Sequence, residues 1–312
     1  MLILRRITQT GVVLLGVTVA TFLLMHLAPG RPLQANPELR ADPTAVERWL
    51  QLRELDKPLP AQFFSWLSRL WRGDFGVSLI YNRPVAELVV ERLPATILLS
   101  GSAFILALSL AMLYGALCAV NRGSRLDRTL NFLSLCGISI PSFWAGMLLL
   151  ILFSYHLPWL PAAGMRTPGD GSILDVSRHM VLPVLVLSTG IFAYYFRYIR
   201  QAVLDVLEQD YIRTARAKGL PMQRIFYRHV LPNVALPLVT LAALSLPVLF
   251  TGTVVVETVF AWPGLGRFVV FSAMARDYPA IMFVNLYTAL LVALASLLAE
   301  LLCLVFDPRL KP

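Results

Sequence analysis

Charged residues are scarce in this chain of 312 residues. Asp, Glu, Lys and Arg make up 14% of it and hydrophobic residues 57%, whereas a soluble domain usually carries about 25% charged residues. This shortage excludes an ordinary soluble domain and predicts an integral membrane protein. The net charge of +9 would suggest nucleic-acid binding in a soluble protein. In a membrane protein the positive-inside bias explains it, provided that the basic residues lie on alternate loops.

Several catalytic and metal-binding patterns are also missing. None of the three lysines follows a glycine, so the chain contains no GxxxxGK[ST] phosphate-binding loop. It contains neither HExxH nor the GxSxG nucleophile elbow. Cys118, Cys136 and Cys303 lie in or beside apolar segments without CxxC spacing, which argues against a disulfide framework or a zinc site. We therefore predict no catalytic residues and no metal site.

Ionisable residues are absent from the interiors of the long apolar runs, and the acids Glu257 and Glu300 lie only at their edges. Carriers driven by protons or ions usually need such residues inside their helices. This pattern argues against a secondary carrier, which remains the alternative from another class. His26 beside Met25 has the composition of a soft-metal contact, but an interfacial histidine is the preferred interpretation.

Six stretches lack Asp, Glu, Lys and Arg over a length suited to a spanning helix of about 20 residues. They are Ile7–Gly30, Leu93–Asn121, Thr129–Met165, His179–Phe196, Val230–Val256 and Tyr278–Ala299. The third stretch is long enough for one helix and a loop, because Pro158, Pro161 and Gly164 interrupt its second half. We therefore predict an all-α membrane protein with six transmembrane helices.

The basic residues alternate between the predicted loops. They concentrate before the first span, between spans two and three, between spans four and five, and after the last span. By the positive-inside rule these sites are cytoplasmic. Both termini are therefore predicted to be cytoplasmic, and the large segment Pro29–Leu93 after the first span is predicted to be external.

The external segment has helical patterns of its own. Asp42-Pro43 and Pro60 each resemble a helix start, and the second helix carries apolar residues with helical spacing from Phe63 to Trp71. Gly73–Gly76 is expected to form a turn, and Val85–Arg92 a third short helix. These helices either cap the outer mouth or dock an external protein.

The last external loop contains helix breakers beside apolar residues. We interpret it as a re-entrant turn followed by a short interfacial helix, and irregular backbone at that depth is tolerated only on protein or beside a cavity. The loop is therefore predicted to border the pathway. Glu257 either faces that pathway or hydrogen-bonds the loop. The predicted pathway or external-gate residues are Glu257, Trp262, Pro263, Gly264 and Gly266.

A basic island, Asp210–Pro232, lies between the fourth and fifth spans. Asp210 is a candidate N-cap, Gly219 a candidate left-handed C′ residue, and Pro221 prevents continuation, so a helix is expected over Tyr211–Lys218. Its small residues suit a cleft on another protein. An ordinary loop that is basic only because of topology is the other interpretation.

The island resembles the EAA---G---------I-LP signature of ABC importer permeases. Ala215, Gly219 and Leu231-Pro232 match it, whereas Arg213, Thr214 and His229 depart from it. The first two departures leave a glutamate-specific contact open. Other stretches resemble the B-type permease of the dipeptide/oligopeptide/nickel branch almost end to end. They include Leu55–Leu59, Gly73–Ser78, Arg83–Val85, Gly137–Pro141, Glu257–Phe260 and Trp262–Arg267.

The resemblance implies a type I ABC importer fold in a bacterial inner membrane. It implies an N-terminal part, residues 1–93, and a permease domain, residues 94–306, with a cytoplasmic coupling loop at 198–232. The implied partners are a homologous second permease, two ATP-binding subunits and an extracytoplasmic substrate-binding protein. The implied ATPase-coupling residues are Asp210, Tyr211, Arg213, Thr214, Ala215, Arg216, Ala217, Lys218 and Gly219.

No cofactor is expected on this chain, because ATP and Mg²⁺ would be bound by the partner ATPases. The chain is then not an enzyme in itself. Peptides are the expected cargo, with nickel or a metal chelate as the alternative within the same branch. An intramembrane enzyme would need a nucleophile and a base within the spans, and the sequence offers no such pair.

Overall fold

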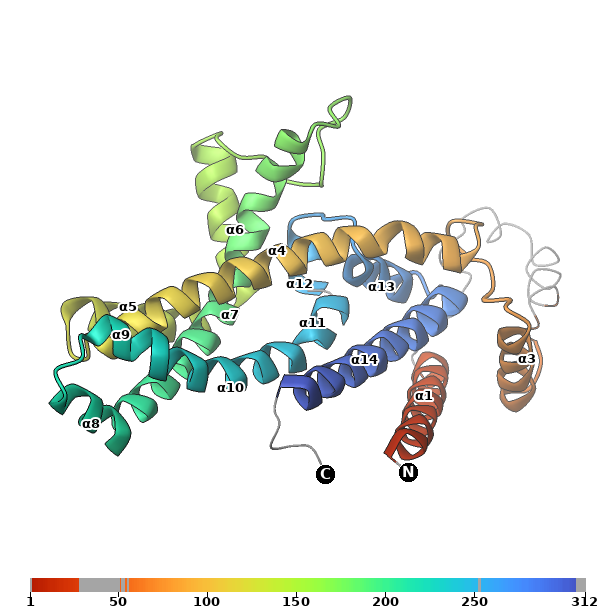
Figure 1. Cartoon of the computed structure of the whole chain (residues 1–312). Helices are drawn as coiled ribbons and strands as arrows, with labels where there is room; N and C mark the ends of the chain where they lie inside the picture. Colours follow the sequence, from red (N-terminus) through yellow and green to blue (C-terminus); the bar gives the residue numbers. More distant parts are fainter. Residues whose placement is uncertain (1, 28–50, 52–53, 55, 252–253, 307–312) are drawn as a thin grey trace. The chain divides into compact units, whose positions relative to one another are not determined.

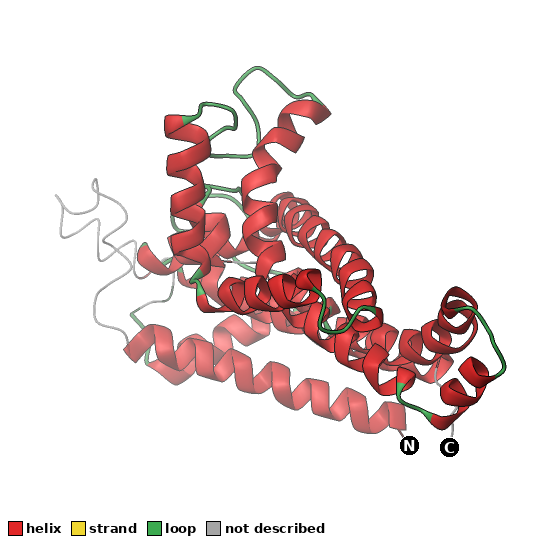
Figure 2. Ribbon diagram, turned by 90° about the vertical axis from the view of Figure 1, so that its left-hand side faces the viewer, coloured by secondary structure: helices red, strands yellow, loops and turns green. Residues whose placement is uncertain are grey.

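The computed structural model describes residues 2–27, 51, 54, 56–251 and 254–306. Figure 2 shows that its regular structure is helical, joined by loops and turns; across these residues no strand is formed, and Val77 and Pro84 make a single antiparallel bridge. The all-α prediction is confirmed. The helix expected at Asp42-Pro43 lies outside the described residues.

The helices follow one another as labelled in Figure 1. They are α1 (Leu2–Leu27), α3 (Leu59–Trp71), α4 (Val85–Val120), α5 (Arg125–Ser139), α6 (Ser142–Leu150), α7 (Ile173–Leu207), α8 (Asp210–Ala217), α9 (Met222–Ile225), α10 (Leu231–Leu244), α11 (Leu246–Thr251), α12 (Val254–Val259), α13 (Leu265–Met274) and α14 (Tyr278–Phe306). Two π-helical segments, Ile151–His156 and Phe226–Val230, continue α6 and α9.

Within the described ranges, five helical segments are long and apolar enough to cross a membrane, or six if one bent pair counts as a span. The five are Thr8–Leu27, Val85–Val120, Ile173–Leu207, Met222–Leu244 and Tyr278–Leu301. The bent pair is Arg125–Ser139 with Ser142–His156. This count agrees with the six predicted spans.

The third predicted span is broken. A single helix was expected from Thr129, but α5 ends at Ser139, and the next helix starts at Ser142 with a bend of 100°. Pro141 explains the break, because proline disfavours helical backbone in the residue before it. Ile140 accordingly has φ −88° and ψ 121°.

The fifth predicted span is also divided. Val230–Val256 was expected to form one helix, but α10 ends at Leu244 and α11 starts at Leu246. Pro247 occupies the first turn of α11, where its missing N–H would have no helical partner in any case. The prediction of a separate short helix at Val85–Arg92 is likewise wrong, since α4 runs on through Pro94 to Val120.

The chain divides into two units. The first comprises Met1–Pro94 and Gly264–Ala293, and the second Ala95–Pro263 and Leu294–Pro312. In the first unit, Phe63 and Trp66 of α3 pack on a cluster formed by α1 and the start of α14. That cluster contains Phe22, Met25, Ile281 and Met282. One face of α3 therefore packs on protein.

A buried carboxylate fixes the external loop of the first unit. Asp277 has no exposed surface. It accepts hydrogen bonds from the Ser78 hydroxyl and, at 3.0 Å, from the Leu79 backbone N–H. It also accepts a weaker one from Ala280 N–H at 3.4 Å, in the first turn of α14. The loop that follows the Gly73–Gly76 turn is thus held on the start of α14.

The core of the second unit joins α4, α7, α8 and the α9–α10 region. Its buried side chains include Cys118, Phe196, Ile199, Ile225 and Val230. Gly115 permits the close approach of α4 to α7, because a Cβ there would lie 3.1 Å from Ile199 and 3.2 Å from the Phe196 carbonyl.

Asp277→Asn is expected to destabilise the protein by about 1–3 kcal/mol, because asparagine keeps only one acceptor oxygen, so that either Ser78 or Leu79 loses its buried acceptor. The measurement is thermal unfolding of the purified protein in detergent. Asp74→Asn is the matched control, since exposed Asp74 accepts from Gly76 N–H through one oxygen that asparagine retains. Equal melting temperatures for the two variants would contradict this role for Asp277.

Candidate coupling helix and pathway region

The first turn of α8 differs from the prediction. Gln209 precedes the helix in extended conformation and makes no side-chain cap. Asp210 is instead the first helical residue, so the N-cap assignment was wrong. Its side chain is 96% exposed and pairs with Arg213 at 3.3 Å. An acid in the first turn still suits the positive end of the helix dipole.

The end of α8 matches the prediction for Gly219. This residue has φ +77°, a conformation that glycine adopts without the Cβ penalty. Its N–H donates to the Arg216 carbonyl at 2.9 Å, and Leu220 N–H donates to the Ala215 carbonyl at 3.3 Å. These two bonds form a Schellman motif. They fix the direction in which the chain leaves the helix.

Two side chains attach α8 to the second unit. Ile212 has no exposed surface and Ala215 is 7% exposed, and both belong to the core that includes Val203 and Leu207 of α7. Their spacing of three places them on one face of the helix. The other predicted coupling residues are exposed: Asp210, Tyr211, Arg213, Thr214, Arg216, Ala217, Lys218 and Gly219. The helix is thus anchored on one face and exposes Arg213, Arg216 and Lys218 on the other.

A buried ion pair supports this region from α7. The Arg200 guanidinium donates from Nε and Nη2 to the two carboxylate oxygens of Asp127, at 2.6 and 2.8 Å. Asp127 also accepts from Gly123 N–H at 2.9 Å and from the Asn131 amide at 2.8 Å. Asp127 is 3% exposed. The pair therefore ties the α4–α5 turn to α7, two turns of helix before α8.

The predicted pathway loop is partly assembled in the second unit. Glu257 is 1% exposed and accepts a hydrogen bond from the Thr96 hydroxyl at 2.9 Å. Trp262 has no exposed surface, and its indole N–H donates to the Ala95 carbonyl at 2.8 Å. The Trp262 backbone N–H donates to the Glu257 carbonyl at 2.8 Å. The loop is thus packed on the turn of α4 that directly follows Pro94.

The remaining predicted gate residues are divided between the two units of the chain. Pro263 ends the second unit, whereas Gly264 and Gly266 belong to the first. Gly264 caps α13 in extended conformation and Gly266 is buried in its first turn. The expected short helix after the loop is therefore present. Thr96 was not among the predicted residues, because its only signal in the sequence is a hydroxyl inside an apolar run.

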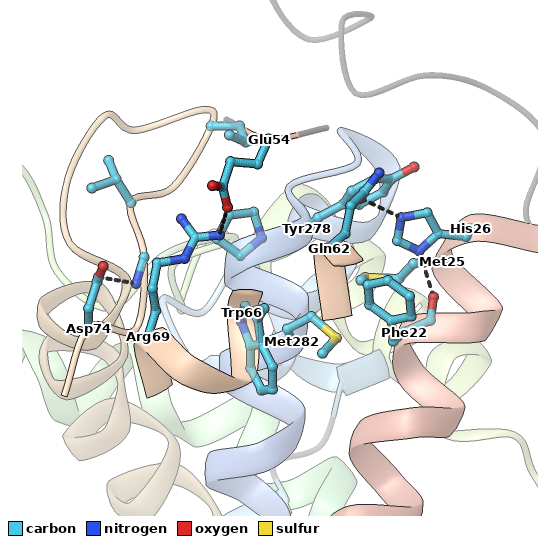
Figure 3. Close-up of a pocket in the computed structure, with 14 residues that line it drawn as sticks. Phe22, Met25, His26, Glu54, Gln62, Trp66, Arg69, Asp74, Tyr278 and Met282 are labelled. Carbon is cyan, nitrogen blue, oxygen red and sulfur yellow. Dashed lines mark hydrogen bonds and ion pairs between the residues drawn. The ribbon is translucent and has the colours of Figure 1, made fainter. Parts of the chain in front are cut away.

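A hollow of about 310 Å³ lies in the first unit (Figure 3). Phe22, Met25 and His26 of α1 face Trp66 of α3 and Tyr278 of α14 across it. His26 Nδ1 lies 2.8 Å from the Phe22 carbonyl, and Nε2 lies 3.3 Å from the Gln62 Oε1 atom. Both ring nitrogens are therefore engaged by oxygen atoms at this site.

The rim of this hollow is charged. Glu54 lies 2.7 Å from Lys57 and 3.6 Å from Arg69. The hydrogen bond from Lys57, followed by that from Ser65, lowers the pKa of Glu54 below its usual value. Among the residues that the structure describes, no three His, Cys, Asp or Glu side chains lie together in a way that would hold a metal ion.

Comparison with known proteins identifies the family. Residues 111–312 match the family described as binding-protein-dependent transport system inner membrane component. The chain belongs to this family. Residues 1–100 match a second family, which is described as the N-terminal part of binding-protein-dependent transport system membrane components. The predicted membership and the predicted multi-pass location in the inner membrane are confirmed.

Curated relatives match over nearly the whole chain. The oligopeptide transport system permease protein AppB of Bacillus subtilis is 40% identical over 99% of this chain and 98% of its own length. The dipeptide transport system permease protein DppB of Escherichia coli K12 is 36% identical, with the same shares covered. The di/tripeptide permease protein DppB of Pseudomonas aeruginosa is 36% identical over 95% of this chain and 94% of its own.

A solved structure shares the fold. A chain of the MetNI methionine ABC transporter in an inward-facing conformation aligns with this protein with a TM-score of 0.58 and 18% sequence identity. The alignment covers 72% of this protein and 98% of the MetNI chain. This similarity confirms the predicted type I importer fold. Which side of the membrane holds the termini stays a prediction.

Arg200→Ala is expected to destabilise the assembled transporter by about 3–5 kcal/mol, because the buried Asp127 carboxylate loses its counter-charge and keeps only neutral donors from Gly123 and Asn131. Thermal unfolding in detergent measures the change. Arg122→Ala is the control, because its 3.1 Å contact with Glu208 joins side chains that are 65% and 64% exposed, and such pairs contribute about 0–1 kcal/mol. Similar losses in both variants would contradict the supporting role of the buried pair.

Proposed function

We propose that this inner membrane component is one permease half of an ABC importer for di- or oligopeptides. Membership of the family and near full-length similarity to oligopeptide, dipeptide and di/tripeptide permease proteins support the cargo class. The observation that carries the mechanism is α8, a short helix anchored by Ile212 and Ala215 with a basic surface turned outward.

In this mechanism α8 is the coupling helix. Its exposed residues enter a groove on an ATP-binding partner, where Arg213, Arg216 and Lys218 favour acidic groups. Because Ile212 and Ala215 attach α8 to the core shared with α7, movement of the ATPase displaces α7 with it. A switch between inward- and outward-facing states requires contacts that differ between those states. Nucleotide-driven closure of the ATPase dimer supplies that difference.

The remaining parts follow from this assignment. A second, homologous permease completes the pathway, two ATP-binding subunits bind ATP and Mg²⁺, and an extracytoplasmic binding protein delivers cargo. This chain then has no ATPase site and no cofactor of its own. Residues 1–93 form the N-terminal transmembrane helix and the external loop, and residues 94–306 form the permease domain. Glu257, Trp262, Pro263, Gly264 and Gly266 border the outer gate, and both termini are cytoplasmic.

Gly219→Val is expected to abolish peptide uptake while the protein stays in the membrane. A β-branched residue at φ +77° is strained by roughly 1–3 kcal/mol, which disrupts the Schellman turn and the exit of the coupling helix. Uptake of labelled trialanine is measured in liposomes that contain the complete transporter, its binding protein and internal ATP.

Gly169→Val is the matched control. Gly169 has φ +89° and, like Gly219, meets nothing within 4 Å of an added Cβ, so the strain is similar but lies far from α8 in sequence. We expect uptake to survive this change. Wild-type uptake by Gly219→Val would refute the coupling role, and uptake by the permeases without ATPases would favour a secondary carrier.

A further inference from the structure

The break between α5 and α6 is exposed on the second unit. Ser139, Ile140, Pro141 and Ser142 are all exposed. They lie in the middle of a run without charged residues, Thr129–Met165. Irregular backbone at membrane depth is tolerated only where it is covered by protein or lines a water-filled cavity, because hydrocarbon offers no hydrogen-bond partners. The exposed break therefore does not face lipid.

Two hollows lie along the middle of α7, and the first of them also touches this break. The first, about 430 Å³, is lined by Ile140, Ser142, Thr189 and Tyr194, among others. The second, about 280 Å³, is lined by Ser100, Phe104, Tyr195 and Ser245, among others. Leu187, Gly190 and Tyr194 line both hollows. The two hollows are therefore neighbours along one face of α7. Such a hollowed face favours a wall that lines a cavity over a flat surface that packs against another subunit.

This wall is uncharged and mostly apolar, with a few hydroxyl groups set among the apolar side chains. Thr189 Oγ1 donates to the Leu185 carbonyl at 2.8 Å, and Ser100 Oγ lies 2.8 Å from the Leu249 carbonyl. Each such hydroxyl keeps lone pairs that accept a further hydrogen bond. A peptide main chain supplies the matching N–H donors, and its side chains meet apolar neighbours irrespective of sequence.

No packing contact in this wall explains why residue 190 of α7 is a glycine. An added Cβ would meet nothing within 4 Å, although glycine destabilises a helix interior by about 1 kcal/mol relative to alanine. Gly137 differs, because a Cβ there would lie 2.7 Å from Thr189 Cγ2, so that α5 needs glycine to pack on α7. Gly190 leaves open space between the two hollows instead.

We propose that Thr189, Gly190 and Tyr194 of α7, together with Ser142 at the α5–α6 break, form a cargo-contacting wall that binds the peptide main chain. The proposal rests on the importer function proposed above and adds the residues that touch cargo. It implies that this wall does not distinguish cargo by side-chain charge, so that selection of that kind occurs elsewhere.

Gly190→Leu places a branched side chain where the hollows meet. In the complete transporter with its binding protein we expect uptake of trialanine, Ala-Lys-Ala and Ala-Glu-Ala to fall by about tenfold each, equal to about 1.4 kcal/mol in rate. ATP hydrolysis stimulated by the binding protein should persist, which distinguishes a blocked path from a misfolded or uncoupled permease. Gly16→Leu is the control, since Gly16 of α1 is exposed and also meets nothing within 4 Å. Normal uptake by Gly190→Leu overturns the proposal, as does a loss restricted to one peptide charge.

Thiol labelling tests the same wall without a bulky substitution. In a background that lacks Cys118, Cys136 and Cys303, Thr189→Cys should react with a membrane-impermeant methanethiosulfonate, and trialanine with the binding protein and ATP should slow that reaction. Val13→Cys of α1, where the native side chain is 55% exposed, should not react, because a thiol in hydrocarbon does not ionise. Failure of Thr189→Cys to react with the reagent in any nucleotide state, with or without trialanine, overturns the proposal. Failure of the unmodified transporter to import any peptide with ATP would count against the importer function instead, whatever the labelling shows.

Discussion

The attachment of α8 to the membrane core is the constraint on which the rest of this structure depends. Two apolar side chains, Ile212 and Ala215, hold a short polar helix against α7 and α9. A helix of eight residues is marginal in water by itself. Its position is therefore set by this burial and by the left-handed turn at Gly219. Without both, the basic surface would have no fixed direction relative to the spans.

Several buried polar interactions of the second unit lie where the chain changes direction. Asp127 and Arg200 hold the turn between α4 and α5, and Glu257 and Trp262 hold the loop after α12 on α4. In a largely apolar protein such buried groups must be paired, because an unpaired one is strongly destabilising. The turns are consequently defined by specific pairs, whereas the long helices between them are held by apolar packing.

Much of this architecture could be predicted from composition and local patterns. The charge-free runs indicate the spans, and Gly219 with Pro221 indicates the end of α8. The predictions failed where one proline decides between a continuous and a broken helix: Pro141 breaks its segment, whereas Pro94 lies inside α4. The outcome depends on tertiary contacts, and buried Leu88, Val89, Ala95 and Leu99 hold α4 on both sides of Pro94. Pairs distant in sequence, such as Thr96 with Glu257 or Ser78 with Asp277, leave no local pattern and were not predicted.

The division of labour within α8 has an evolutionary consequence. Six of its eight residues are exposed and contribute little to the folded state, and surface substitutions of that kind usually change stability by about 0.5 kcal/mol or less. The outward residues are therefore free to diverge while the anchor is retained. If α8 binds an ATPase as proposed above, such divergence would allow related permeases to bind different ATPase subunits with no change in the membrane fold.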